Sequence, residues 1–168
     1  MSVVNEPEVS KTTAWSYGLA VVGIAAFMLF FAFAGFFTPM ETGGIAVLVL
    51  LVFIEAIMLL LLRSLYRTRY VLTDEELVIK TSKLIGGNKT IALKTIKSIE
   101  TTFIPFGVRL FGASFHGGYY RVPGLGRTFL AITNFHDGLL IKTKNRNYII
   151  TPKNRLDFKE AIEAKISF

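Results

Sequence analysis

Two long apolar runs near the start of the chain limit its fold more than any other feature. They cover Ala14–Phe37 and Ile45–Leu62, and only the seven residues TPMETGG separate them. At about 1.5 Å per residue, helices over these runs would measure roughly 36 and 27 Å, against a hydrocarbon core of about 30 Å. Because backbone polar groups cannot stay unpaired in lipid, each run must be helical. The short link then predicts a two-helix transmembrane hairpin, which we assign to residues 14–68.

Two other interpretations of these runs remain open. A buried helical pair in a soluble protein would need neighbours that cover two helices apolar on every side. The remaining hundred or so residues are polar and strand-like, and offer no such surface. A secretory signal is disfavoured because residues 1–13 are not a positively charged n-region and the first run is too long. Ala32-Phe33-Ala34 nevertheless resembles a cleavage site, so removal of the first helix stays an alternative.

Charged residues next to the helices predict their orientation. The N-terminal segment, residues 1–13, is short and polar, and we expect a loose tail. Arg63, Arg67 and Arg69 follow the second helix, whereas the link carries only Glu41. Since positively charged flanks stay on the cytoplasmic side, we expect a multi-pass protein of the cell membrane with both termini in the cytoplasm.

Glu55 is the unusual residue of the second run, where a carboxylate is costly unless it is protonated or paired. One interpretation is a polar contact to another membrane subunit, or a proton-carrying group. The other is a protonated side chain that bonds to Ser16, Tyr17 or a backbone carbonyl inside the hairpin. Sequence alone does not decide between them.

The C-terminal part of the chain is strongly basic. From Arg63 onward there are 18 Lys and Arg against 8 Asp and Glu, a net formal charge of +10. Near an anionic membrane surface each such cation contributes on the order of 1 kcal/mol of attraction. Nucleic acid is not expected as a partner, because no RNP-type stacking motif or recognition-helix pattern is found. The chain has no Cys, which excludes disulfides and thiolate metal sites.

From Tyr70 onward the apolar pattern alternates, which is typical of strands bounded by turns. The terminal segment TPKNRLDFKEAIEAKI instead has helical spacing, with Thr151 or Asn154 as its cap. About seven strands followed by one amphipathic helix favour a small β-barrel or split sandwich closed by that helix. The expected strands are Tyr70–Leu72, Leu77–Lys80, Thr90–Leu93, Ile96–Thr102, Thr128–Thr133, Leu139–Thr143 and Tyr148–Thr151.

Three segments carry a resemblance to a known family. They are YVLTDEELVIK (Tyr70–Lys80), KTIALKTIKSIE (Lys89–Glu100) and LLIKTKNRNYIITPKNRLDF (Leu139–Phe158). In this order they resemble the bacterial pleckstrin-homology (PH) domains found on short membrane proteins. The resemblance covers roughly residues 69–168 and implies a PH-like split β-barrel with a C-terminal helix behind the transmembrane hairpin. It also implies a non-catalytic module that binds or scaffolds at the membrane, and it transfers no catalytic residues.

The stretch Thr101–His136 contains no Asp or Glu, but is rich in glycine and aromatic residues. Arginine forks onto phosphate, and glycine lets backbone N–H groups approach an anion. One interpretation is therefore a surface for anionic lipid headgroups or an acidic partner. The other is a set of bent strands with rings in the core and solvated arginines. The candidate surface residues are Arg109, His116, Arg121 and Arg127.

Catalytic and metal-binding patterns are weak. His116 and His136 lie twenty residues apart with Asp137 as the only evident carboxylate partner, and Gly124-Leu125-Gly126 lacks the strand–turn–helix setting of a dinucleotide loop. We expect no enzyme, no cofactor and no metal. The predicted function is to hold a protein partner or anionic lipid headgroups at the cytoplasmic face. The expected partners are the lipid bilayer and either another protein or further copies of this chain in a homo-oligomer. The alternative is an accessory structural subunit of a larger membrane enzyme or transporter.

Overall fold

The structure, a computed structural model, divides the chain into two compact units. It describes residues 3–37, 42–83, 86–105, 107–111 and 116–166. One unit comprises residues 11–63, and the other combines residues 1–10 with residues 64–168. The second unit, called the β domain below, is therefore built from both ends of the chain.

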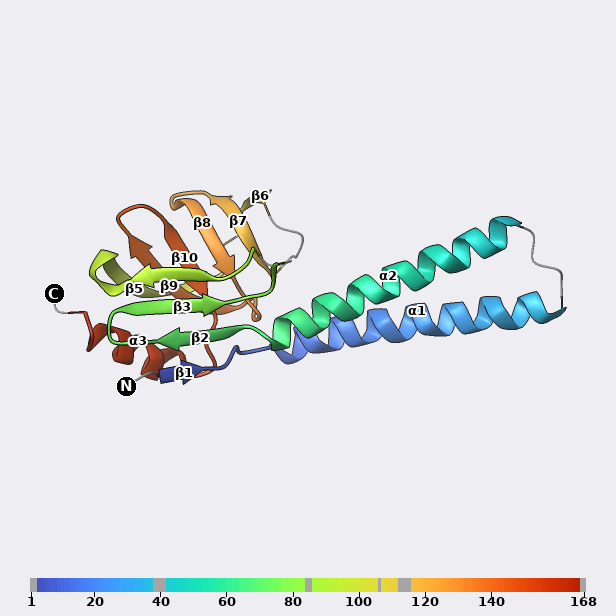
Figure 1. The fold of residues 1–168 in the computed structure, drawn as a ribbon, viewed down its shortest axis with the longest axis horizontal. Helices are drawn as coiled ribbons and strands as arrows, with labels where there is room; N and C mark the ends of the chain where they lie inside the picture. The colour runs from blue at the N-terminus through green and yellow to red at the C-terminus, as the bar shows by residue number, and fades with distance from the viewer. Residues whose placement is uncertain (1–2, 38–41, 84–85, 106, 112–115, 167–168) are drawn as a thin grey trace. The chain divides into compact units, whose positions relative to one another are not determined.

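The first unit consists of two apolar helices, α1 (Lys11–Phe37) and α2 (Thr42–Tyr66), drawn in blue and blue-green in Figure 1. Their membrane-compatible parts, Lys11–Ala34 and Gly44–Tyr66, have mean hydropathies of 2.2 and 3.2. Both are long and apolar enough to cross a bilayer. The two predicted helices are thus present, and α2 continues past the predicted end at Leu62.

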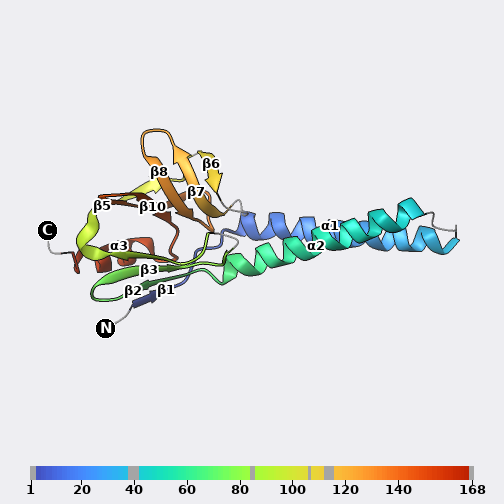
Figure 2. The same cartoon turned by 45° about the horizontal axis from the view of Figure 1, so that its top comes forward.

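The β domain contains two sheets. The first has the order β1–β2–β3–β4 and is antiparallel throughout. A tight turn joins β2 to β3, where the Thr73 amide donates to the Glu76 carbonyl at 2.9 Å. Figure 2 shows β1, β2 and β3 side by side. The strands are β1 (Val3–Asn5), β2 (Arg69–Leu72), β3 (Glu76–Lys80) and β4 (Lys89–Ala92).

The second sheet has the order β5–β9–β10–β8–β7–β6. All neighbours are antiparallel except β10 and β8, which run parallel. A short 3₁₀ turn, η2 (Leu93–Thr95), leads from the first sheet into the second. The strands are β5 (Ile96–Phe103), β6 (Val108–Phe111), β7 (Gly117–Val122), β8 (Gly126–Ala131), β9 (Asp137–Thr143) and β10 (Asn147–Ile150).

The main hydrophobic core lies between the sheets, because alternate residues of both point into it. Tyr70 and Ile79 of the first sheet and Phe129 of the second are all fully buried there. The terminal helix α3 (Arg155–Glu163) adds Phe158 and Ile162 to this core. The Phe158 ring lies 6.4 Å from that of Tyr70. The helical spacing predicted for this segment thus places one apolar face of α3 in the core.

The fold class expected from the sequence is confirmed: two apolar helices, then a β domain and a terminal helix. All seven expected strands are present within a few residues of their predicted bounds. The sheets do not close into a barrel among the described residues. Three strands were missed, namely β1, β6 and β7. Asn154 is the N-cap of α3, but its side chain makes no capping hydrogen bond.

The expectation of a loose N-terminal tail is wrong for residues 3–10. Strand β1 pairs with β2 in the register Val4 to Val71. Beyond it, the Glu8 amide donates to the Thr151 carbonyl at 2.9 Å and the Ser10 amide to the Thr133 carbonyl at 3.2 Å. Backbone hydrogen bonds along this whole segment replace solvent, so the segment is an integral part of the β domain.

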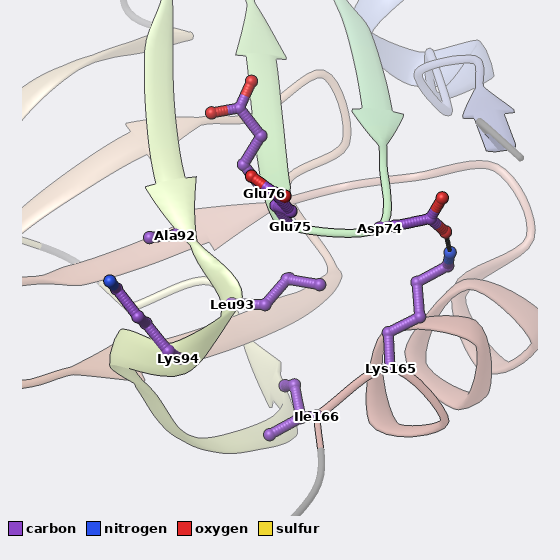
Figure 3. A pocket seen from close by; sticks show the side chains of 8 residues that line it. All are labelled: Asp74, Glu75, Glu76, Ala92, Leu93, Lys94, Lys165 and Ile166. Carbon is purple, nitrogen blue, oxygen red and sulfur yellow. Dashed lines mark hydrogen bonds and ion pairs between the residues drawn. The ribbon is translucent and has the colours of Figure 1, made fainter.

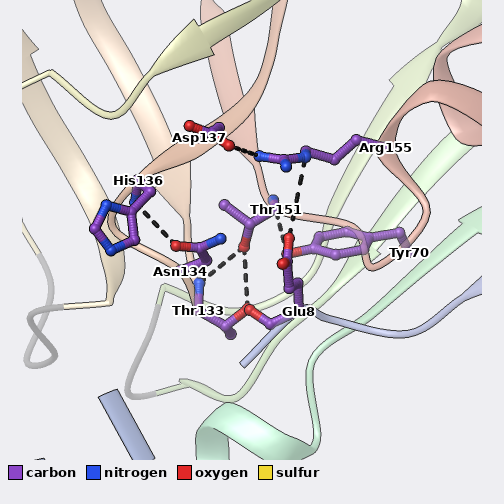
Figure 4. A network of polar contacts seen from close by, with 8 residues as sticks. All are labelled: Glu8, Tyr70, Thr133, Asn134, His136, Asp137, Thr151 and Arg155. Carbon is purple, nitrogen blue, oxygen red and sulfur yellow. Dashed lines mark hydrogen bonds and ion pairs between the residues drawn. The ribbon is translucent and has the colours of Figure 1, made fainter. Parts of the chain in front are cut away.

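A polar network beneath the N-terminal segment holds it in place (Figure 4). The Thr133 hydroxyl lies 2.6 Å from the Glu8 carbonyl and 3.0 Å from the Thr151 hydroxyl. The buried Tyr70 hydroxyl donates to the Ala131 carbonyl. Burial raises the pKa of Tyr70 to about 12. Arg155 adds an ion pair to Asp137 at 2.5 Å and a longer one to Glu8.

We predict that Thr133→Val loosens the N-terminal segment. The change keeps the side chain's shape but leaves the Glu8 carbonyl without its donor, which costs about 1–3 kcal/mol of unfolding free energy. Amide hydrogen exchange at Glu8 and Ser10 should become faster in the full-length protein. Thr133→Ser is the control, because it keeps the hydroxyl and loses only a methyl group. Equal exchange and equal stability in the two variants would contradict the role of this hydrogen bond.

Candidate functional site

Two arginines face each other on neighbouring strands of the larger sheet. Arg121 of β7 and Arg127 of β8 are direct register partners, and both are exposed. Side chains of such partners leave the same face with Cβ atoms about 5 Å apart. Within the described part of the chain, no carboxylate lies within ion-pair distance of either guanidinium. The pair is thus a local concentration of positive charge.

A third arginine extends this pair onto the next strand. Arg146 immediately precedes Asn147, whose parallel partner on β8 is Thr128, the residue after Arg127. Its guanidinium carbon lies 4.7 Å from the centre of the Tyr119 ring. Tyr119 is two residues before Arg121 on β7, and side chains two apart share one face of a strand. Arg121 on β7, Arg127 on β8 and Arg146 in the turn just before β10 therefore lie on one face of the sheet, and we call these three residues the arginine row.

A lysine from the first sheet reaches the same aromatic ring. The Lys89 ammonium lies 5.4 Å from the centre of the Tyr119 ring and 5.2 Å from that of Phe129. It also donates to the Gly86 carbonyl at 2.8 Å. Burial raises the pKa of Tyr148 nearby, while the charge of Arg146 opposes that rise. We call the Tyr119 and Phe129 rings the aromatic platform. Arg146 of the arginine row contacts its Tyr119 ring, and Lys89 is a fourth cation over both rings.

Arg109 lies on the other face of the sheet. It pairs in register with Tyr120, and its guanidinium donates to the Tyr120 hydroxyl at 3.0 and 3.1 Å. Tyr120 belongs to a second, smaller apolar cluster with Val122 and Leu130. Arg109 therefore covers that cluster with its guanidinium and does not join Arg121 and Arg127.

His116 is buried, with 2% of its surface exposed, and its ring lies 5.1 Å from that of Phe135. Burial lowers its pKa from 6.5 to about 4. The side chain is therefore neutral near pH 7 and adds no positive charge to a surface. Of the four candidate residues Arg109, His116, Arg121 and Arg127, only the last two lie together and exposed.

The three arginines that follow the apolar run differ in their surroundings. Arg63 and Arg67 are exposed. Arg69 instead donates to the carbonyls of Tyr66 and Thr68 and lies 3.7 Å from a Glu6 oxygen. It thus connects the start of β2 to the N-terminal segment.

Glu55 lies within α2, and one of its carboxylate oxygens is buried. That oxygen accepts no hydrogen bond from any residue that the structure describes. Ser16, one of the partners considered above, donates to the Thr12 carbonyl at 2.8 Å. The buried oxygen keeps both interpretations of Glu55 open.

One cavity of the β domain lies away from the arginine row. It has a volume of about 610 Å³ and is lined by Asp74, Glu75, Glu76, Ala92, Leu93, Lys94, Lys165 and Ile166. Figure 3 shows Lys165 paired with Asp74 at its rim. This pairing lowers the pKa of the Asp74 carboxyl to about 2. The cavity is mixed in charge and holds no constellation of nucleophile and base. Among the described residues, no three His, Asp or Glu side chains are grouped to hold a metal ion.

Sequence reasoning found two members of the arginine row and missed the third. Arg146 lies outside the acid-free stretch and is brought to it only by the parallel pairing of β10 with β8. Tyr119 lies in the stretch Thr101–His136, which the sequence marks only as rich in glycine and aromatic residues. The signal for Arg146 lies in the turn sequence KNRN, which places a cation just before a predicted strand.

A β domain of the PH type behind two apolar helices defines the class of this protein. A family model described as "bacterial PH domain" matches residues 68–166, which is more than half of the chain. The chain therefore belongs to the bacterial PH-domain family. The comparisons with curated proteins and with solved structures found no match. PH domains are generally non-catalytic binding modules, which agrees with the arrangement of the site.

We predict that His116 makes the protein less stable at mildly acidic pH. Because the folded pKa of His116 lies below its ordinary value, protonation favours the unfolded state. The free energy of unfolding should fall as the pH drops from about 6.5 toward about 4. The difference in melting temperature between pH 7 and pH 5 should shrink in His116→Leu. His136→Gln is the control, because it removes the other histidine, which is exposed; an equal effect there would contradict the assignment.

Proposed function

We propose that this protein is a membrane-anchored, non-catalytic binding module. Its helix pair inserts into the cell membrane, and its β domain lies at the cytoplasmic face. There the domain holds anionic lipid headgroups or an acidic protein partner. The observation that carries this proposal is the arginine row. Arg121 and Arg127 are exposed and Arg146 is half-buried, and none of the three has a carboxylate partner among the described residues.

The connection of the two units supports a hairpin with both ends on one side. Residues 3–10 enter α1 at Lys11, and the chain returns to the β domain at Ser64. Since residues on both sides of the helix pair belong to one folded domain, they must share a compartment. Arg63 and Arg67 at the end of α2 favour the cytoplasm as that compartment. The net charge of +10 from Arg63 onward suits an anionic membrane surface.

This topology predicts the labelling of introduced cysteines, which are unambiguous because the chain has none of its own. In right-side-out bacterial membrane vesicles, an impermeant maleimide should label Glu41→Cys. Val4→Cys and Lys97→Cys should react only after the vesicles are permeabilised. Labelling of all three positions from outside would contradict the hairpin. Labelling of Val4→Cys and Lys97→Cys alone from outside would reverse the orientation.

The second candidate is an accessory subunit of a membrane enzyme or transporter. The buried oxygen of Glu55 favours it, because a carboxylate within an apolar helix is stabilised by a polar group of a neighbour. In that case the helix faces provide the docking surface and the β domain is a secondary contact.

Gentle detergent extraction should separate the two candidates. For a binding module we expect the purified full-length chain to carry anionic lipid in excess over zwitterionic lipid, and to keep it in Glu55→Leu. An accessory subunit instead predicts a stoichiometric membrane protein companion that is lost in Glu55→Leu but kept in Met58→Leu, an apolar exchange one turn away. Mass spectrometry of the eluate measures both. A lone chain with neither enrichment nor companion would contradict both candidates.

A further inference from the structure

We infer that the arginine row, Arg121, Arg127 and Arg146, is a binding site for a phosphate group. The inference rests on the proposed function, because it takes the β domain to be a binding module, and it names the site and the ligand chemistry. The phosphate is that of a phosphomonoester, carried either by a lipid headgroup or by a small soluble molecule.

The pairing of Arg121 with Arg127 is the first argument. Like charges placed directly opposite each other on antiparallel strands destabilise a sheet. Their register partnership prevents them from separating along the strands, and no described carboxylate offsets their repulsion. The stretch that surrounds them, Thr101–His136, contains no acidic residue at all. An anion between the two guanidinium groups supplies the missing negative charge.

The setting of Arg146 is the second argument. Its guanidinium is held by the Tyr119 ring at 4.7 Å, and the Thr143 hydroxyl accepts from its backbone amide at 3.1 Å. Contact with the ring face leaves the N–H groups at the edge of the guanidinium available. No described residue accepts a hydrogen bond from the side chains of Arg121, Arg127 or Arg146. Two forked donor groups on adjacent strands and a third in the turn before β10 thus lie on one face, without acceptors among the described residues.

Hydrogen bonds fix the turn between β7 and β8 and join it to the start of β10, so the arginine row keeps its arrangement without a ligand. The Leu125 amide donates to the Val122 carbonyl at 3.1 Å and closes the turn between β7 and β8. The Asn147 side chain donates to the Leu125 carbonyl at 2.7 Å and joins this turn to β10. The three strand ends that carry the row are therefore tied to one another. Preorganised donors lose little freedom when a ligand binds.

The number of donors favours phosphate over carboxylate. A carboxylate offers two oxygens and one charge, which two arginines already satisfy. A phosphomonoester has three terminal oxygens and close to two charges at pH 7. It can accept forked hydrogen bonds from Arg121 and Arg127 while a third oxygen faces Arg146. The Lys89 ammonium, 5.4 Å from the same Tyr119 ring, adds positive charge at the edge of the site.

The experiment measures adducts of the full-length chain in detergent micelles by native mass spectrometry. Glycerol 3-phosphate is the soluble probe, and dioleoyl phosphatidic acid is the lipid probe; phosphatidylcholine is the background lipid. The variant is Arg121→Gln/Arg127→Gln. The control, Lys97→Gln/Lys153→Gln, also removes two positive charges, but from exposed positions of the β domain outside the row. Melting temperatures confirm that both proteins are folded.

We expect the apparent Kd for the phosphate probe to rise by about tenfold or more in the arginine variant, as loss of charge-assisted hydrogen bonds implies. The lysine control should change by no more than about twofold, the residual effect of net charge. Binding of the lipid probe alone assigns the phosphate to a headgroup, and binding of glycerol 3-phosphate assigns it to a soluble ligand. Equal losses in the two variants, no loss in the arginine variant, or no binding of either probe would overturn the inference.

The same data separate this inference from the proposed function. If the wild-type chain binds phosphatidic acid and the arginine variant binds it equally well, the site is wrong while the binding module stands. If neither probe binds but extraction yields an acidic protein companion, the module stands with a different ligand. If the chain binds no anion and carries no companion, the proposed function fails together with the site.

Discussion

Backbone hydrogen bonds between the N-terminal segment and the β domain are the constraint on which the rest of the structure depends. Val3–Asn5 extend the first sheet, and the amides of Glu8 and Ser10 donate to Thr151 and Thr133. The helix pair is therefore a long insertion between two parts of one domain. In the proposed hairpin topology, the pairing of this three-residue strand with β2 keeps the segments before and after the helix pair on the same side of the membrane.

The same pairing also protects an exposed strand edge. Without β1, the backbone groups of β2 would form an open edge able to pair with another chain. The hydrogen bonds of Thr133 and Thr151 and the ion pair of Arg155 with Asp137 hold the segment beyond β1 in place. A fragment that begins at Arg69 would lack this strand and leave that edge open. Binding measurements on the domain therefore need residues 3–10, and in practice the full chain.

The apolar helices were predictable because a run of more than eighteen apolar residues has few alternatives. Seven strands were predictable from alternation, and the order of their motifs carried the family resemblance. Strand β1 was missed because three residues carry too short a pattern to stand out. Strands β6 and β7 were missed because glycines interrupt the alternation, as at Gly117 and Gly118.

The candidate site was harder to predict than the fold, since side chains become neighbours only through strand register. Arg109, Arg121 and Arg127 look equivalent in the sequence, but the pairing of Arg109 with Tyr120 turns it to the opposite face. Arg146 joins the row from a separate hairpin through a parallel pairing that alternation does not reveal. His116 was a candidate for the same surface, but its side chain is buried, and burial lowers its pKa to about 4.

Glycine links the fold of this domain to its charge distribution. Gly86 has a φ of 120°, and a Cβ there would lie 2.9 Å from the Phe129 ring and near the backbone of Gly118. Only glycine lets the β3–β4 connection approach so closely. Three residues later, Lys89 extends over the Tyr119 and Phe129 rings. The glycine-rich sequence thus brings a cation of the first sheet to the aromatic platform that also holds Arg146. A domain optimised for stability alone would place carboxylates among these cations, and their absence concentrates positive charge where three strands and a loop meet.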